Sequence, residues 1–183
     1  DSSCAAARIQ MLSSLPPTQS EALKKYTGPA FHKINASLRT NEEAPNTPPG
    51  ENTLRTIASM DAAMKTATVG DNVTAYRGLQ GNYSRELYSL HDKNQLVGAV
   101  LQDKGFSSMT TDYETASGWA DHAIFEVKVP KHARGLYVGA DPKGAFSEFP
   151  NEKEIIMDRN GRLKVTGVKK QPSGKLLIQA EWQ

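Results

Sequence analysis

The spacing of the apolar residues changes at about residue 70, and this change constrains the fold more than any other feature. Before it, apolar residues recur every three or four positions, as at Leu54, Ile57 and Met60, which predicts amphipathic helices. After it, short β-rich runs alternate with turn residues, as at 73–77 and 123–129, which predicts strands. Helices first and strands later indicate an α+β fold.

The helical part, residues 1–70, contains breaks that divide it into separate helices. A first helix around 20–26 ends at Gly28, and Pro29 begins the next one, because glycine breaks helices and proline is tolerated in a first turn. A third helix runs through Met60 and Met64, whose spacing favours packing in the core over a ligand role.

The strand-rich part, residues 71–183, is divided by turn residues. We expect strands over 73–77, 105–108, 123–129, 135–138, 154–158, 162–169 and 175–182. Asn160-Gly161 predicts one hairpin turn and Pro172-Ser173-Gly174 another. Asp112 is expected to cap a short helix that passes through Trp119.

Composition limits the class of protein. The 183 residues fit one domain, and 38% hydrophobic with 23% charged residues is typical of a globular chain without a membrane span. A net charge of +2 without a basic block gives no electrostatic footprint for nucleic acid. Cys4 stands alone, so neither a disulfide framework nor a zinc site is expected. The first four residues lack signal-peptide features, and a processed chain would already have lost them.

Three separated segments of the strand-rich part carry chemically useful residues: Tyr76-Arg77-Gly78, Gly105-Phe106-Ser107-Ser108-Met109-Thr110 and Phe149-Pro150-Asn151-Glu152-Lys153-Glu154. Each segment alone is common on protein surfaces. Glu152 and Glu154, however, are two positions apart, so on one strand they would point to the same face. Two adjacent carboxylates repel, and such a pair suits a site where one binds a growing positive charge and the other handles a proton.

Taken in order, these segments resemble the R-S-E class of bacterial mono-ADP-ribosyltransferases, which includes the actin-modifying clostridial binary toxins and arginine-modifying effectors. Arg77 matches the family arginine, Ser108 the first serine of its Ser-Thr-Ser strand, and Glu152-Lys153-Glu154 its Glu-x-Glu. Met109 and Thr110 replace the family's Thr and second Ser. In the helical part, Tyr26-Thr27, Ile34-Asn35 and Leu38-Arg39 resemble the helix on the NAD side.

The resemblance implies a fold, a substrate and a site. The fold would have N-terminal helices packed against a two-sheet, mostly antiparallel β core in a single catalytic domain, residues 1–183. NAD would be the substrate, bound by Arg77 at its phosphates and by Gly78, Ser108, Thr110 and Glu154, with no metal.

The same resemblance implies a division of roles among the residues. Glu154 would stabilise the sugar cation that forms when nicotinamide leaves, and Ser108 would orient that carboxylate. Glu152 would orient an arginine acceptor and take its proton. Phe146 and Phe149, in the loop that leads to the two glutamates, would contact the target.

The resemblance also implies the partner and leaves alternatives open. We expect a monomeric secreted toxin that acts in the cytosol of a target cell on an accessible arginine of actin or another host or competitor protein. Neither nucleic acid nor a membrane is an expected partner. The alternatives are an NAD glycohydrolase, a transferase with a non-arginine acceptor, and a binding module that has lost the reaction.

Overall fold

The computed structural model describes residues 2–141 and 143–183, with side chains from residue 7 onward, so the Cys4 side chain lies outside the described part. The helices are α1 (Ser2–Ser13), α2 (Pro17–Thr27), α3 (Phe31–Thr40), α4 (Glu51–Thr66), α5 (Gly81–Asp92) and α6 (Tyr113–Trp119), with 3₁₀ turns at Val138–Ala140 and Pro150–Glu152. The strands are β1 (Val73–Leu79), β2 (Val100–Asp103), β3 (Ser107–Thr110), β4 (Ala123–Val129), β5 (Gly135–Leu136), β6 (Glu154–Met157), β7 (Gly161–Lys170) and β8 (Leu176–Trp182).

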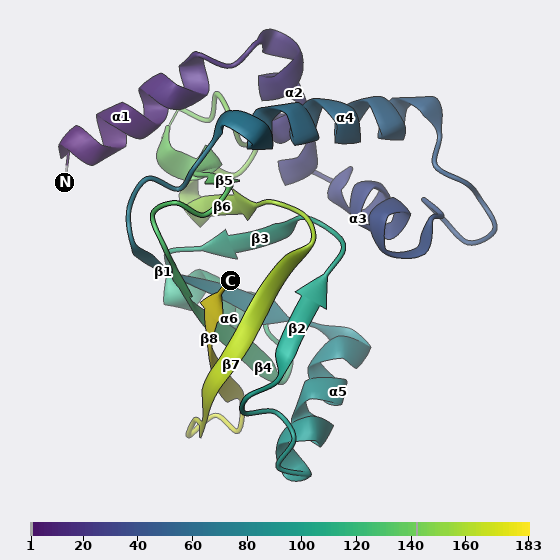
Figure 1. The fold of residues 1–183 in the computed structure, drawn as a ribbon, viewed down its shortest axis with the longest axis vertical. Coiled ribbons are helices and arrows are strands. Elements are labelled where there is room, and N and C mark those ends of the chain that lie inside the picture. The colour runs from purple at the N-terminus through teal and green to yellow at the C-terminus, as the bar shows by residue number, and fades with distance from the viewer. Residues whose placement is uncertain (1, 142) are drawn as a thin grey trace.

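The α+β class is as expected, but the expectation of two sheets is wrong. The described strands form one mixed sheet in the order β2-β7-β8-β4-β1-β3-β6-β5, with β4 and β8 parallel. Its two halves are joined by β1 and β3, which share the single register pair Tyr76↔Thr110. Neighbouring strands twist relative to one another, and across this short contact the direction changes, so that β3 and β6 run across the view of Figure 1 while β7 and β8 run steeply.

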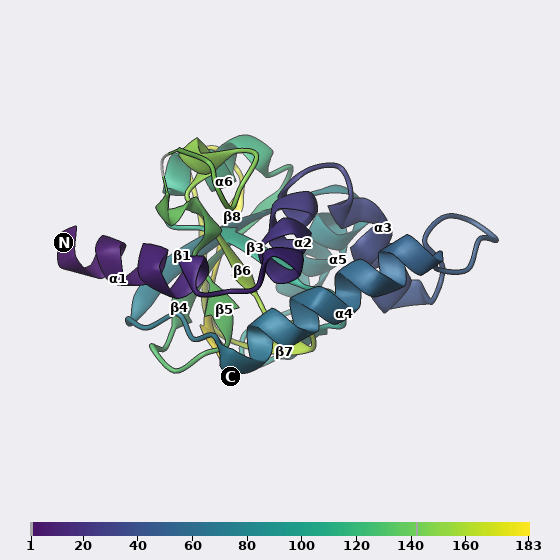
Figure 2. The same cartoon turned by 90° about the horizontal axis from the view of Figure 1, so that it is seen from above.

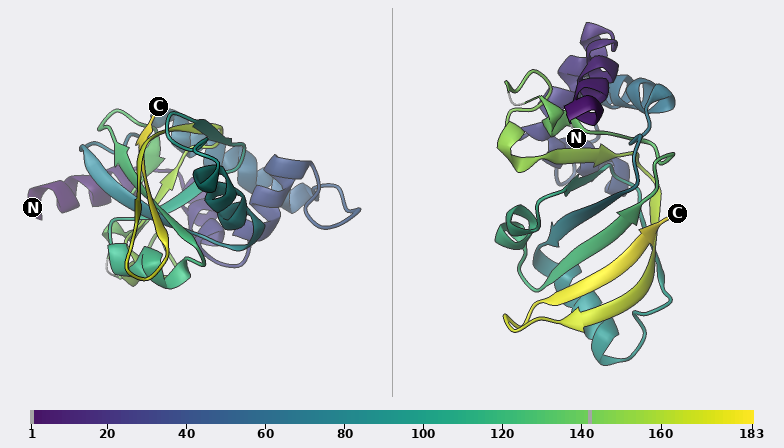
Figure 3. Two further views of the ribbon diagram at one scale, coloured as in Figure 1. Left: turned by 90° about the horizontal axis from the view of Figure 1, so that it is seen from below. Right: turned by 90° about the vertical axis from the view of Figure 1, so that its left-hand side faces the viewer.

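Two apolar cores lie on the two faces of β6. Ile156 packs with helix residues such as Met60, whereas Ile155 and Met157 pack with Phe125 and the β1–β4–β8 side of the sheet. Side chains alternate along a strand, so one short strand serves both cores. Helices α1, α2 and α4 therefore cover the β3–β6–β5 end of the sheet, as the view from above shows (Figure 2), and α5 lies beside the other end (Figure 3).

Several elements differ from the sequence expectation. Helices α1 and α5 and strand β2 were not expected, although Tyr83, Leu87 and Leu90 do recur at helical spacing in α5. The turn at Asn160-Gly161 does not join a hairpin, because β6 pairs with β3 and β5 while β7 pairs with β2 and β8. The turn at Pro172-Ser173-Gly174 does connect the antiparallel strands β7 and β8.

The helices of the described part of the chain are unsuited to a bilayer, since none of them combines sufficient length with sufficient apolar character to cross one.

Candidate active site

A cavity of about 850 Å³ opens where α2 and α3 meet β1, β2 and β3. Its volume lies in the range of small-molecule and cofactor pockets. Arg77, Gly78, Ser108, Glu152 and Glu154, which the sequence places in three distant segments, all line this cavity. The topology explains this, because β1 pairs with β3 and β3 pairs with β6, so the three segments become neighbours.

Glu154 is the buried carboxylate of the cavity, with 6% of its surface exposed. Burial raises the pKa of Glu154 from 4.5 to about 7, and the charge of Glu152 adds to the rise, while a hydrogen bond with Ser108 opposes it. The Ser108 hydroxyl also lies 3.2 Å from the phenol oxygen of Tyr26. The site therefore holds a carboxyl group that changes charge near neutral pH.

Tyr26 and Asn35 tie the helices to the strand that carries Ser108. The Tyr26 hydroxyl donates to the carbonyl of Phe106 at 3.2 Å. The Asn35 side chain donates to the Tyr26 oxygen at 3.0 Å and accepts from the backbone N–H of Phe106 at 2.9 Å. All three residues are buried. This network fixes the position of β3 relative to α2 and α3.

Glu152 does not share a strand with Glu154, contrary to the sequence expectation. Glu152 ends a 3₁₀ turn, Lys153 adopts a left-handed conformation with φ 51°, and Glu154 begins β6. Both carboxylates nevertheless line the cavity. Burial raises the pKa of Glu152 as well. The backbone turn at Lys153, rather than the period of a strand, thus brings the carboxylates of Glu152 and Glu154 into the same cavity.

Thr110 is fully buried and is not among the residues that line the cavity. Its hydroxyl donates to the backbone carbonyl of Glu152 at 2.6 Å and accepts from the N–H of Asp112 at 3.0 Å. Thr110 therefore holds the backbone of Glu152 in place. This role differs from the direct contact with NAD that the resemblance implied for Thr110.

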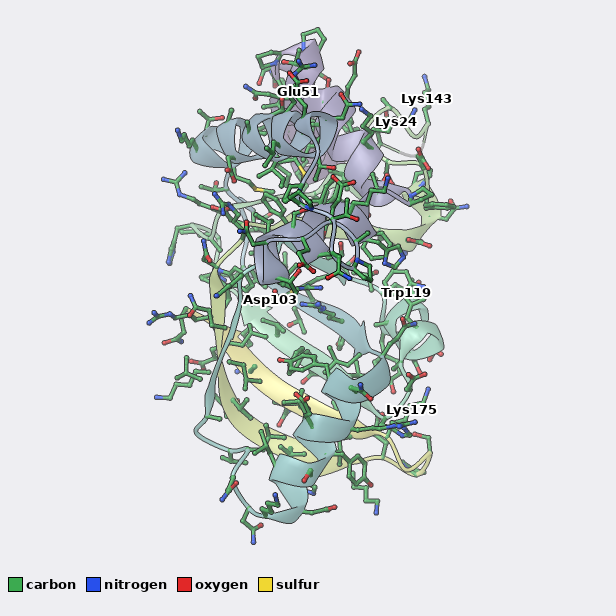
Figure 4. The ribbon with its side chains drawn as sticks, turned by 90° about the vertical axis from the view of Figure 1, so that its right-hand side faces the viewer. Lys24, Glu51, Asp103, Trp119, Lys143 and Lys175 are labelled. Atoms are coloured by element: carbon green, nitrogen blue, oxygen red, sulfur yellow. The ribbon has the colours of Figure 1, made fainter. Side chains whose placement is uncertain are left out.

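Arg77 and Arg39 share one carboxylate. Arg77 Nη1 donates to Asp103 Oδ2 at 3.2 Å and to Ser107 Oγ at 3.3 Å. Arg39 forms a two-point hydrogen bond with Asp103, from Nε to Oδ1 at 2.9 Å and from Nη2 to Oδ2 at 2.8 Å. Figure 4 shows Asp103 where the helices meet the sheet, opposite Trp119. Asp103 was not predicted as a site residue, because β2 was not recognised as a strand from the sequence.

Gly78 lines the cavity, and the structure gives a reason for glycine at this position. A Cβ here would collide with the carbonyl oxygen of Ala116 in α6 and with the backbone nitrogen of Ala120, directly after α6. The absent side chain therefore allows α6 to pack directly on β1.

The two loop aromatics have different environments. Phe149 is 49% exposed and lines the cavity mouth, whereas Phe146 is only 8% exposed and belongs to the core under the helices. Phe146 is therefore corrected from a target contact to a packing residue, and Phe149 remains the exposed aromatic of this loop.

No group of three or more metal-ligating side chains gathers within the described residues.

Comparisons with known proteins identify the family. The profile of a family described as ADP-ribosyltransferase exoenzyme matches residues 5–182. An NAD(+)--arginine ADP-ribosyltransferase from Enterococcus faecalis is 26% identical over 153 residues, which cover 80% of this chain and 28% of that protein. The chain thus spans less than a third of that relative's length.

Solved structures share the fold. Plx2a, an ADP-ribosyltransferase toxin from Paenibacillus larvae, superposes with a TM-score of 0.79 at 22% identity, covering 96% of this chain and 90% of its own. C3stau2 from S. aureus, solved with NAD, gives a TM-score of 0.78 at 18% identity over 100% of this chain and 93% of its own.

Proposed function

The chain belongs to the ADP-ribosyltransferase exoenzyme family, and from this premise we propose that it transfers ADP-ribose from NAD to an arginine side chain of a target protein. The observation that carries the proposal is that Glu152 and Glu154 line the same cavity as Arg77 and Arg39. Cations suited to phosphates and carboxylates suited to a sugar cation thus share one space. The arginine-modifying relative from E. faecalis supports the choice of acceptor.

NAD binds in the cavity with its pyrophosphate near Arg77 and Arg39. A guanidinium presents a planar fork of donors that matches phosphate oxygens. The nicotinamide end lies toward Gly78, Ser108 and Glu154. That C3stau2 from S. aureus, which shares the fold, was solved with NAD supports this substrate.

In the cleavage step, the bond between the ribose and the nicotinamide nitrogen breaks, and its electron pair neutralises the pyridinium ring. The ribose is left with oxocarbenium character, which the ionised Glu154 stabilises. Ser108 orients this carboxylate through the hydrogen bond that also lowers its pKa. The positive charge of the bound nicotinamide ring favours the ionised form of Glu154.

In the transfer step, a guanidinium nitrogen of the target arginine forms a bond to the ribose carbon. An arginine is a poor nucleophile while protonated, because its pKa lies above ~12. Glu152 orients the guanidinium and accepts the proton that the attacking nitrogen loses. Thr110 supports this role indirectly, through its hydrogen bond to the Glu152 carbonyl.

Phe149 contacts the target protein at the cavity mouth, where its ring is exposed. The described fold acts as one catalytic domain and as a monomer. The protein reaches the cytosol of a target cell as a secreted toxin, and actin or another host or competitor protein supplies the arginine. Its family membership supports this delivery.

The test is incubation with labelled NAD and a lysate of candidate target cells, followed by mass spectrometry of the labelled protein. The expected result is ADP-ribose on an arginine, with none in a parallel reaction with Glu154→Gln. ADP-ribose on another residue type would establish a different acceptor. Complete conversion of NAD to free ADP-ribose without any protein adduct would instead establish an NAD glycohydrolase.

A further inference from the structure

Asp103 is an anion in a cavity that is proposed to bind an anionic substrate. Its carboxylate accepts hydrogen bonds from Arg39 Nε and Nη2, from Arg77 Nη1 and from the backbone N–H of Gly105 at 2.8 Å. These donors occupy both oxygens. A repelling charge near the pyrophosphate requires an explanation, since it weakens the attraction of the arginines.

The contacts of Asp103 connect three elements around the cavity. Asp103 ends the edge strand β2, Arg39 lies in the last turn of α3, and Arg77 lies in the central strand β1. The Arg39 side chain is 41% exposed, and that of Arg77 is 21% exposed. A long, partly exposed arginine loses considerable side-chain entropy when it is held in one conformation.

Asp103 keeps its negative charge beside these two arginines. The cavity lining contains the cations Arg39, Arg77 and Lys104 together with the acidic residues Asp103, Glu152 and Glu154. Although burial raises the pKa of Asp103, hydrogen bonds from Arg39 and the charge of Arg77 lower it below its usual value. The Asp103 carboxylate is therefore ionised in the folded protein near neutral pH.

We infer that Asp103 is a positioning residue, which fixes Arg39 and Arg77 as a preorganised pair for the pyrophosphate of NAD. This inference rests on the proposed function, because it assigns a role within the same cavity. Fixing both guanidinium groups before NAD arrives lowers the entropic cost of binding, and the donors not used by Asp103 remain for the phosphates. The benefit of fixed arginines exceeds the repulsion from a carboxylate whose oxygens are already occupied.

The first experiment measures binding of ADP-ribose and of inorganic pyrophosphate by calorimetry, to wild type and to Asp103→Asn. The variant keeps the shape of the side chain and removes its charge. Asp61→Asn is the matched control, since Asp61 forms a similar two-point pair with Arg159 and does not line the cavity. We expect Asp103→Asn to weaken both ligands about 10-fold, the size of a lost charge-assisted hydrogen bond, and Asp61→Asn to change neither. Equal or tighter binding by Asp103→Asn overturns the inference.

A second experiment separates positioning from structural damage. In NAD hydrolysis, Asp103→Asn should raise KM about 10-fold and leave kcat within about 2-fold, because Glu154 and Ser108 are untouched. Because Asp103 acts partly through Arg39, its replacement should weaken ADP-ribose binding less in an Arg39→Gln background than in wild type, and the effect that remains is the one through Arg77. A loss of kcat at constant KM, or full additivity with Arg39→Gln, overturns the inference.

Failure of the proposed function has a different signature. If wild type binds ADP-ribose, and binds it more tightly than Asp103→Asn, but does not consume NAD, the positioning role is supported and the proposed activity is refuted.

Discussion

Replacing Glu154 with glutamine should make the protein more stable at alkaline pH. Wild-type Glu154 is 6% exposed, and burial raises its pKa from 4.5 to about 7. Below pH 4.5 both the folded and the unfolded protein hold the proton. As the pH rises to about 7, the unfolded chain loses this proton first, so the free energy of unfolding falls.

The magnitude follows from that difference in pKa. Each pKa unit corresponds to about 1.4 kcal/mol, so ionising Glu154 costs the folded state about 3 kcal/mol above pH 8. The amide of Glu154→Gln carries no charge at any of these pH values. The variant should therefore exceed wild type in stability by up to about 3 kcal/mol at pH 8, and the two should converge near pH 4.5.

Urea denaturation followed by circular dichroism from pH 4.5 to 8.5 measures this difference directly. Other titrating groups are common to the two proteins and largely cancel in the comparison. Identical pH dependence for wild type and variant would refute the assignment of a raised pKa to Glu154. A variant that loses stability at pH 8 would show that the carboxylate makes folded-state contacts stronger than its burial cost.

Three further predictions concern the same cavity. Ser108→Ala should lower kcat for NAD cleavage by about 10-fold and leave the melting temperature nearly unchanged, because its hydroxyl orients Glu154; full turnover in steady-state assays would disprove this role. Phe149→Ala should reduce labelling of a protein target while sparing NAD hydrolysis, and equal loss of both activities would argue against a target contact. Phe146→Ala should instead destabilise the fold by about 3 to 5 kcal/mol, measured by thermal unfolding, because its ring is buried. Activity should survive a chelator such as EDTA, and loss that a divalent cation restores would show a metal requirement.

The sequence predicted the site better than the fold around it. Arg77, Ser108 and Glu154 could be placed together because their short motifs, taken in order, resemble those of one family, and the structure brings all three into one cavity. Asp103 has no such motif, since a four-residue edge strand with a half-exposed Val100 lacks the alternation that identifies strands. Its partner Arg39 was noticed only as part of a resemblance.

Pairing between distant segments was the other feature that could not be predicted from the sequence. The order of strands in the sheet depends on contacts such as the pairing of β1 with β3, which consists of one register pair. No local sequence pattern predicts this pairing. Likewise, Glu152 and Glu154 were expected to share a face because of strand period, but the left-handed Lys153 lies between them. Phe146 and Phe149 are chemically alike in the sequence, and only tertiary packing separates the buried ring from the exposed one.

The most direct test of the account measures nicotinamide release and arginine modification in the same reaction, for wild type, Glu152→Gln and Glu154→Gln, each first shown to be folded. Glu154→Gln should lose both activities by about 100-fold or more, since every pathway passes through the sugar cation. Glu152→Gln should lose arginine modification by roughly 100- to 10,000-fold and keep much of its slow NAD hydrolysis. Equal loss of both activities in Glu152→Gln, or full NAD hydrolysis in Glu154→Gln, would contradict the proposed division between the two carboxylates.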